Sequence, residues 1–311
     1  MPASGQHFAG MAGVLIAAVL WGTTGTAATF APELSPLAVG AVAMGTGGLL
    51  QGLIAAAGIL RQRALILRYW RFLLTGAIAV AIYPLAFYAS MRFAGVTVGT
   101  VMSIGSAPLL SALIEHRFDG LRLTKQWMCG AAAGISGMVL LCLAESGTSS
   151  TAGEHAMTGV FLAVIAGFTY ALYSWSARRM MHAGVVSHAA MGVTFGAGAV
   201  LLMPVLFMTG GPLLESWNNA AVGIYMALVP MFLGYVCFGF GLARIPASLA
   251  TTITLLEPVI ATLMAVMLVG ERLPPGGWTG VGLIVACLGI ITLPGRRLRS
   301  ALARYVPGII Q

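Results

Sequence analysis

The sequence predicts an all-α integral membrane protein with ten transmembrane helices, arranged as two inverted repeats of five helices. Three observations support this fold class. Only 8% of the 311 residues are charged and 59% are hydrophobic, which is typical of polytopic membrane proteins and not of soluble domains. The charged residues lie between ten long apolar stretches, and the second half of the chain repeats features of the first half.

Each apolar stretch is long enough to cross the hydrocarbon core as a helix, which takes about 17 to 25 residues. In chain order the stretches are 1–32, 34–60, 72–91, 93–114, 126–144, 155–177, 183–214, 216–243, 245–270 (which contains Glu257) and 273–295. They show no alternation of period two, so barrel strands are excluded and the backbone must form its hydrogen bonds within helices. We therefore expect one helix in each stretch.

The basic residues predict the orientation of the helices. If the N-terminus lies in the cytoplasm, 14 of the 16 Lys and Arg residues fall in cytoplasmic loops or the C-terminal tail, and only Arg92 and Arg272 fall outside. Short loops are where the positive-inside rule is most reliable. We expect a multi-pass protein of the cell inner (plasma) membrane with both termini in the cytoplasm. The net charge of +8 then reflects topology, and no nucleic-acid partner is expected.

No cofactor or metal ion is predicted. The four cysteines lie within predicted spans without a CxxC spacing, and the five histidines lie at loops or span ends without forming a ligand cluster. An integral-membrane enzyme would need a nucleophile with a base, or a metal cluster, at a common depth. The spans do not supply one, so we expect no enzyme.

An internal repeat divides the chain. A shift of 150 residues aligns Pro108 with Pro258 and Gly130 with Gly280, and a shift of 151 aligns Trp127 with Trp278. The predicted units are residues 1–149 and residues 150–311, the second ending in a basic cytoplasmic tail. Five spans in each unit is an odd number, so the second unit enters the membrane upside down. Inverted repeats of this kind are typical of transporters that open alternately to the two sides.

The run Leu256-Glu257-Pro258-Val259-Ile260-Ala261, followed by residues 270–273 (Gly-Glu-Arg-Leu) and taken with Leu20-Trp21-Gly22 in the first span, resembles the EamA-type repeat of the drug/metabolite transporter (DMT) superfamily. The resemblance covers the whole chain as two repeats. Within the superfamily the layout is similar to the YddG-type amino-acid exporters, which implies ten helices and the export of small amino acids. The first half departs from the pattern, because Ala107 stands where the second half has Glu257.

Glu257 is the one clear charged residue within a predicted span. A carboxylate at such a depth costs about 2 to 4 kcal/mol on insertion scales and indicates a functional site. It can accept a proton, bind a substrate ammonium, or bond backbone donors near Pro258, and the sequence leaves these roles open.

Small hydroxyl residues recur at a spacing of three in spans four and nine, which places them on one helix face. They include Thr100, Ser103, Thr251 and Thr254. We expect these four to line a translocation cavity, with interhelical hydrogen bonding as the alternative.

Aromatic residues near the membrane middle need a polar partner for their phenol or indole. We expect Trp21, Tyr83, Tyr170 and Tyr235 to line the cavity, with helix packing as the alternative. Pro108 and Pro258 lie within spans at matching positions of the repeats and are predicted hinges, with a static kink as the alternative.

The predicted function is the export of amino acids and related metabolites by alternating access around a central cavity. Its partners are a small-molecule substrate and the lipid bilayer, and the oligomeric state stays open. Phosphorylated substrates are disfavoured because no Lys or Arg falls within a predicted span. A multidrug or organic-cation exporter is the alternative, and a membrane assembly protein without transport activity is the alternative from another class.

Overall fold

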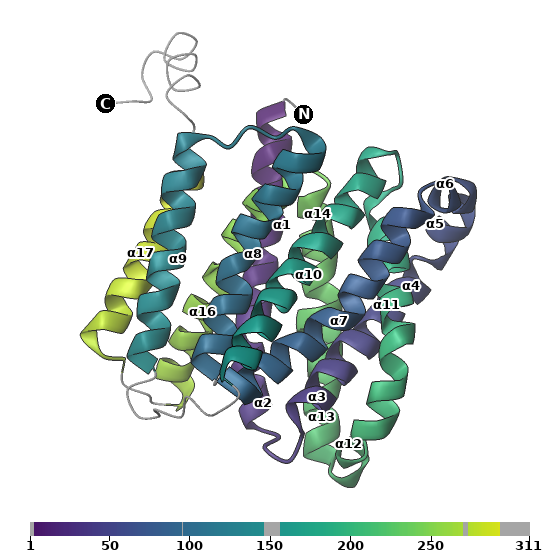
Figure 1. Ribbon diagram of the computed structural model, residues 1–311. Coiled ribbons are helices and arrows are strands. Elements are labelled where there is room, and N and C mark those ends of the chain that lie inside the picture. Colours follow the sequence, from purple (N-terminus) through teal and green to yellow (C-terminus); the bar gives the residue numbers. More distant parts are fainter. Residues whose placement is uncertain (1–2, 95, 146–155, 270–272, 293–311) are drawn as a thin grey trace.

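The computed structural model describes residues 3–94, 96–145, 156–269 and 273–292, and within these ranges the chain is helical without strands (Figure 1). The basic tail predicted after residue 295, most of the loop between the two repeats and residues 270–272 of the Gly-Glu-Arg motif lie outside the described residues. The α-helices are α1 (Ala3–Gly22), α2 (Thr24–Thr29), α3 (Pro36–Gly40), α4 (Gly47–Ile54), α5 (Ala56–Arg61), α6 (Arg63–Arg68), α7 (Trp70–Ala94), α8 (Val96–Asp119), α9 (Lys125–Glu145), α10 (Ala156–His182), α11 (Ser187–Thr209), α12 (Pro212–Glu215), α13 (Trp217–Met226), α14 (Gly234–Leu242), α15 (Ala247–Ile253), α16 (Leu256–Met264) and α17 (Pro275–Thr292).

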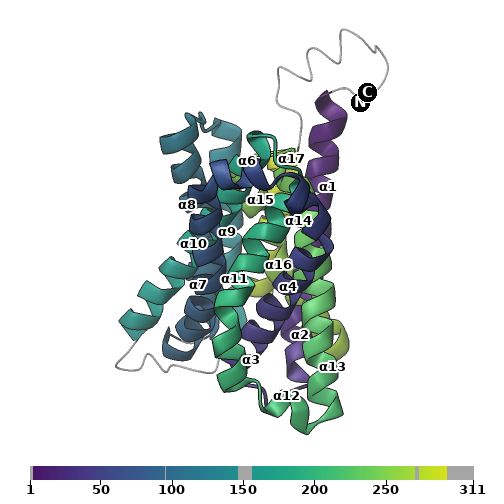
Figure 2. The same cartoon turned by 90° about the vertical axis from the view of Figure 1, so that its right-hand side faces the viewer.

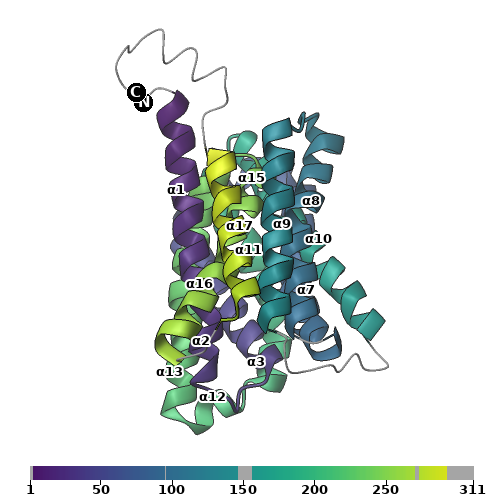
Figure 3. The ribbon, with the colours of Figure 1, turned by 90° about the vertical axis from the view of Figure 1, so that its left-hand side faces the viewer.

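Eight helical segments among the described residues are long and apolar enough to cross a membrane. They are 5–29, 36–54, 70–94, 98–119, 156–182, 187–209, 217–242 and 247–268. Helices α9 and α17, which occupy the remaining two expected stretches, are not among the eight, and they lie side by side (Figures 1 and 3). An all-helical membrane protein is therefore supported, while the count of ten spans and the inverted relation of the halves stay predictions.

Several spans are interrupted by π-helical turns: η1 (Ala41–Thr46), η2 (Ala227–Leu233) and η3 (Ala265–Val269). Such wider turns change the register of the backbone hydrogen bonds and often occur at functional sites. In η2, which contains Pro230, two carbonyl groups accept side-chain hydrogen bonds from other helices. The donors are the Trp21 indole at 2.8 Å from the Pro230 oxygen and the Gln51 amide at 3.3 Å from the Met231 oxygen.

Small residues let the helices approach closely. Gly52 of α4 faces Gly192 and Gly196 of α11, where an added Cβ would lie 3.3 Å from the Gly192 oxygen. Gly137 of α9 faces Gly280 of α17 in the same way. These contacts agree with the role of Gly-xxx-Gly spacings in membrane helix packing. They hold α4 against α11 and α9 against α17.

Two further contacts place the site within the bundle. Helix α10 packs along both α7 and α8, and α1 packs along α14 and α16. The largest group of buried side chains lies where α1, α7, α10, α11 and α14 meet. Figure 2 shows α10, α7 and α11 from the side of α4, and the first residues of α1 lie at the upper end of the bundle in each ribbon view. We call this end the N-terminal end.

Candidate functional site

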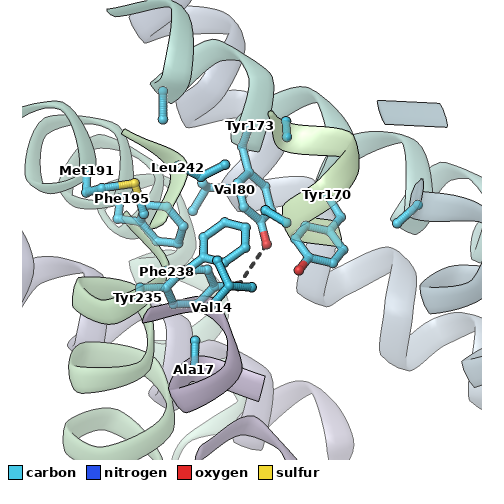
Figure 4. Close-up of a cluster of buried hydrophobic side chains, with 14 of the residues drawn as sticks. Val14, Ala17, Val80, Tyr170, Tyr173, Met191, Phe195, Tyr235, Phe238 and Leu242 are labelled. Atoms are coloured by element: carbon cyan, nitrogen blue, oxygen red, sulfur yellow. Dashed lines mark hydrogen bonds between the residues drawn. The ribbon is translucent and has the colours of Figure 1, made fainter. Parts of the chain in front are cut away.

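Seven aromatic side chains from five helices form one buried cluster near the middle of the bundle. This aromatic cluster consists of Trp21 of α1, Tyr83 of α7, Tyr170 and Tyr173 of α10, Phe195 of α11, and Tyr235 and Phe238 of α14. The ring centroids of Trp21 and Tyr235 are 4.7 Å apart, and those of Tyr83 and Tyr170 are 5.6 Å apart. All four aromatic residues singled out from the sequence are thus brought together. Figure 4 shows five of the seven rings converging from α10, α11 and α14.

The polar atoms of the cluster are mostly paired, as buried phenols and indoles require. The hydroxyls of Tyr173 and Tyr235 are 2.8 Å apart (Figure 4). The Tyr170 hydroxyl lies 3.0 Å from the Thr254 hydroxyl, and the Trp21 indole donates to the Pro230 carbonyl. These bonds tie α10 to α14 and α15, and α1 to η2. The cluster therefore forms a hydrogen-bonded layer that links α1, α10, α14 and α15.

Glu257 lies in the first turn of α16, beside this layer. Its carboxylate is within electrostatic range of the hydroxyls of Tyr83, Tyr88, Tyr170 and Tyr235. No described residue donates a hydrogen bond to the carboxylate, and the side chain keeps part of its surface exposed, as does that of Tyr83. A carboxylate with these surroundings can accept a proton or bind a cationic group.

The hydroxyl stripes divide into three kinds of environment. Thr254 bonds Tyr170 and so belongs to the edge of the aromatic cluster. Thr251 is buried and donates to carbonyl oxygens one turn earlier in its own helix. Ser103 is buried where α8 meets Gly167 of α10, and no described group bonds its hydroxyl. Thr100 of α8 is partly exposed and is not hydrogen-bonded to the cluster.

The two prolines predicted as hinges differ in their surroundings. Pro108 lies inside the continuous helix α8. Pro258 lies in the first turn of α16, after a two-residue interruption at Thr254 and Leu255 that separates α15 from α16. Proline in a first turn costs no helix hydrogen bond. The break in the helix precedes the proline, with Thr254 in the break and Glu257 in the first turn that follows it.

A second charged group, which the sequence reasoning missed, closes the N-terminal end of the bundle. Glu115 is 0% exposed and accepts hydrogen bonds from the backbone nitrogens of Ala247 and Ser248, at 2.7 and 2.9 Å, and from the Ser248 hydroxyl. Arg178 of α10 lies 3.5 Å from the Glu115 carboxylate and donates to the Ile245 carbonyl at 2.8 Å.

One turn further along α8, Asp119 extends this contact. Its carboxylate pairs with Arg179 at 2.8 Å and accepts from the Trp175 indole at 2.9 Å. We call Glu115, Asp119, Arg178 and Arg179 the charged cluster. It joins the ends of α8 and α10 to the start of α15.

Glu115 is therefore a second carboxylate inside a helix of the bundle, besides Glu257. In the sequence it lies just past the fourth apolar stretch, but α8 continues beyond it to Asp119. The signal that points to Glu115 is the helix spacing. Ser111 and Glu115 are four residues apart and lie on one helix face.

Two other features would indicate a site elsewhere among the described residues, a grouping of metal-ligating side chains or a pocket. In the described ranges, no three His, Cys, Asp or Glu side chains are grouped as a metal site would require. A pocket of about 340 Å³ lies between α2, α13 and the end of α16, and Glu257 is not among its lining residues. Its walls include Phe30, Val222, Tyr225 and Leu268. The site for a solute is best sought at Glu257 and the aromatic cluster.

Comparisons with known proteins agree with a transporter. Among bacterial relatives, the uncharacterized transporter YwfM of Bacillus subtilis (strain 168) is 31% identical over 294 residues, which is 94% of this chain and 97% of the relative. A probable terminal-alkyne amino-acid exporter of Streptantibioticus cattleyicolor is 27% identical over 66% of each chain. The threonine/homoserine exporter RhtA of Escherichia coli (strain K12) is 29% identical over 45% of this chain and 47% of its own.

Structure and family comparisons extend over both halves. A crystal structure of a protein with 21% sequence identity superimposes with a TM-score of 0.76 over 95% of this chain and 99% of the other, so the two share a fold. The EamA-like transporter family matches this sequence twice, at residues 8–143 and 157–293. Since the two matches span nearly the whole sequence, the chain belongs to the EamA-like transporter family.

Proposed function

We propose that this protein exports amino acids and related small metabolites across the inner membrane by alternating access. The observation that carries the proposal is the Glu257 carboxylate, which lies within a span, beside the aromatic cluster, without a hydrogen-bond donor among the described residues. A structural carboxylate at this depth would be expected to have such a donor. A carboxylate that binds a proton or an ammonium group during transport does not need such a donor.

The surroundings of Glu257 fit a zwitterionic solute. Its carboxylate and the faces of the neighbouring rings attract an ammonium group. The Tyr83 hydroxyl can donate a hydrogen bond to a substrate carboxylate, whereas the Thr254 hydroxyl already donates to the Thr251 carbonyl. The arginines of the charged cluster are already bound to Glu115 and Asp119. A phosphate group would therefore lack a free cationic partner in this region, which argues against phosphorylated substrates.

The direction of opening follows from the charged cluster. Glu115 is bonded to Ala247 and Ser248, at the start of α15 and nearer the N-terminal end than Glu257. The positive-inside rule predicts that this end lies in the cytoplasm. In this interpretation the protein is closed toward the cytoplasm and reaches Glu257 from outside. The opposite state requires the charged cluster to separate, with Pro108 and Pro258 as candidate hinges.

An organic-cation exporter is the second candidate. Rings with a carboxylate attract any organic cation, and the hydrogen-bonded hydroxyls leave few groups that select for a substrate carboxylate. This candidate predicts that a cation without a carboxylate binds as well as an amino acid does.

Purified protein in liposomes separates the two candidates. Uptake of labelled threonine into liposomes loaded with unlabelled threonine is measured in the presence of either homoserine or its decarboxylated amine. If the protein exports amino acids, homoserine should compete with threonine uptake and the amine should compete only weakly. Equal competition by the amine would favour the cation exporter, and uptake no faster than in empty liposomes across an amino-acid panel would contradict the proposal.

A further inference from the structure

A basic surface at the N-terminal end, outside the candidate site, has features of a lipid-binding element. We call the residues of α5, α6 and the start of α7 that carry Arg61, Arg63, Arg68 and Arg71 the arginine surface. All four arginines are exposed, and no Asp or Glu occurs in the sequence between Glu33 and Glu115. No ion pair to these arginines is present in the part of the chain that the structure describes. Their charges are available to a partner.

The segment lies across the bundle end instead of along it. In Figure 1 α6 is seen almost along its axis at the upper right, and in Figure 2 it runs sideways over the same end. A helix in this orientation lies parallel to the membrane plane, as interfacial amphipathic helices do.

Its inner face is anchored, so the arginines are held on a defined surface. Ile66 is buried among Met180 of α10, Val185 and Ala189. At the junction of α5 and α6, the Gln62 amide donates to the Gly184 carbonyl at 3.2 Å, and its oxygen accepts from the Val186 nitrogen at 2.9 Å. The arginine surface is therefore docked on the loop between α10 and α11, close to the charged cluster.

Apolar side chains stand beside the arginines. Leu60 is 67% exposed, Leu67 is 65% exposed and Trp70 is 51% exposed, and Arg71 lies over the Trp70 ring. An acidic soluble protein or a nucleic acid would match the arginines and leave these apolar groups in water. The boundary between headgroups and acyl chains matches both, since tryptophan and leucine enter it and arginine meets the phosphates.

We propose that the arginine surface binds anionic phospholipid headgroups of the cytoplasmic leaflet and holds the end of α10 and the start of α11 against the membrane. Juxtamembrane clusters of four or more basic residues on an amphipathic helix are attracted to anionic lipid in this way. The proposal depends on the cytoplasmic placement of the N-terminal end, but it does not depend on the substrate. It goes beyond the topological role of the arginines, which ends once the chain is inserted.

The test uses the full protein in nanodiscs that contain phosphatidylethanolamine with increasing phosphatidylglycerol, and native mass spectrometry counts the lipids retained. The wild type is expected to retain phosphatidylglycerol in preference to phosphatidylethanolamine, and added salt should weaken the preference. The triple variant Arg61→Gln, Arg63→Gln, Arg68→Gln should bind phosphatidylglycerol more weakly, by about fivefold for each arginine removed.

Two matched variants complete the test. A second triple variant, Arg117→Gln, Arg122→Gln, Lys125→Gln, removes three exposed charges at the α8–α9 connection of the same end and should retain the lipid. A triple variant with lysine at Arg61, Arg63 and Arg68 keeps the positive charges and should also retain the lipid. This control separates a loss of lipid binding from misinsertion of the glutamine variant. A wild type without preference for phosphatidylglycerol, or equal loss in both glutamine variants, would overturn the proposal. Transport plays no part in this readout, so its failure leaves the proposed function intact.

Discussion

Glu257 and its aromatic neighbours show how far single residues could be predicted. A carboxylate within an apolar stretch and four aromatic residues at mid-span depth are visible in the sequence, and the structure brings Trp21, Tyr83, Tyr170 and Tyr235 into one cluster. Tyr173 and Glu115 were not singled out. Their importance lies in contacts with Tyr235 and with the start of α15, which are far away in the sequence.

The first prediction concerns the charge of Glu257. Glu257→Gln keeps the size of the side chain but cannot take up a proton or attract an ammonium group. We expect transport to fall by about tenfold or more, since a hydrogen bond to a charged group contributes about 1.5 to 3 kcal/mol. The melting temperature in detergent should stay the same or rise, because no described donor loses its partner.

Transport and thermal unfolding are measured for both Glu257→Gln and Glu257→Ala and are compared. Normal transport by the glutamine variant at every pH, with a lowered melting temperature for the alanine variant, would mean that Glu257 only stabilises the fold.

At the scale of elements, the charged cluster is expected to hold α8, α10 and α15 together at one end only. A shift of 150 or 151 residues places Ala265 or Val266 opposite Glu115, and Ala27 or Ala28 opposite Arg178. The second repeat therefore lacks the carboxylate at the matching position, and the first lacks the arginine. We therefore expect this difference between the repeats to favour the state in which the N-terminal end is closed.

The second prediction tests that closure. Glu115→Gln removes the ion pair with Arg178 and weakens three hydrogen bonds to Ala247 and Ser248. In a background without native cysteines, a cysteine at the buried Ala250 should react with a cytoplasmic thiol reagent about tenfold faster in this variant. Glu33→Gln, which changes a carboxylate at the other end bonded to Asn219, is the matched control. Equal labelling rates in folded protein would show that the charged cluster does not keep this end closed.

The third prediction concerns helix contact. An alanine at Gly192 would place its Cβ 2.8 Å from the backbone carbonyl oxygen of Gln51, so α4 and α11 would have to separate. We expect Gly192→Ala to lower the free energy of unfolding by about 1 to 3 kcal/mol. Gly282→Ala on α17, where no described atom lies within 4 Å of the new Cβ, should be neutral or slightly stabilising. Thermal unfolding of both variants in detergent checks this, and equal effects would contradict the packing account.

At the scale of the whole molecule, the sequence predicted an all-helical membrane protein because length and apolar composition suffice to define a span. It did not predict where the spans break. The π-helical turn η2 is an example, because Trp21 and Gln51 donate hydrogen bonds to its carbonyls from other helices. Tertiary contacts of this kind leave no periodic signal in the chain.

The fourth prediction concerns topology. Reporters fused after Gln311 and inserted between Arg61 and Arg71 should both indicate the cytoplasm, because most basic residues lie in loops assigned to that side. A reporter inserted beside Glu33 should indicate the outside. A periplasmic signal at either of the first two positions would contradict ten spans with a cytoplasmic N-terminus.

The measurement that tests the central claim most directly is amino-acid counterflow in liposomes that contain the purified protein. Vesicles loaded with unlabelled amino acid should accumulate the labelled form transiently with the wild type, and Glu257→Gln should reduce the initial rate by about tenfold. Accumulation by wild type and variant at the same rate, or no accumulation by the wild type with any amino acid tested, would contradict an amino-acid exporter centred on Glu257.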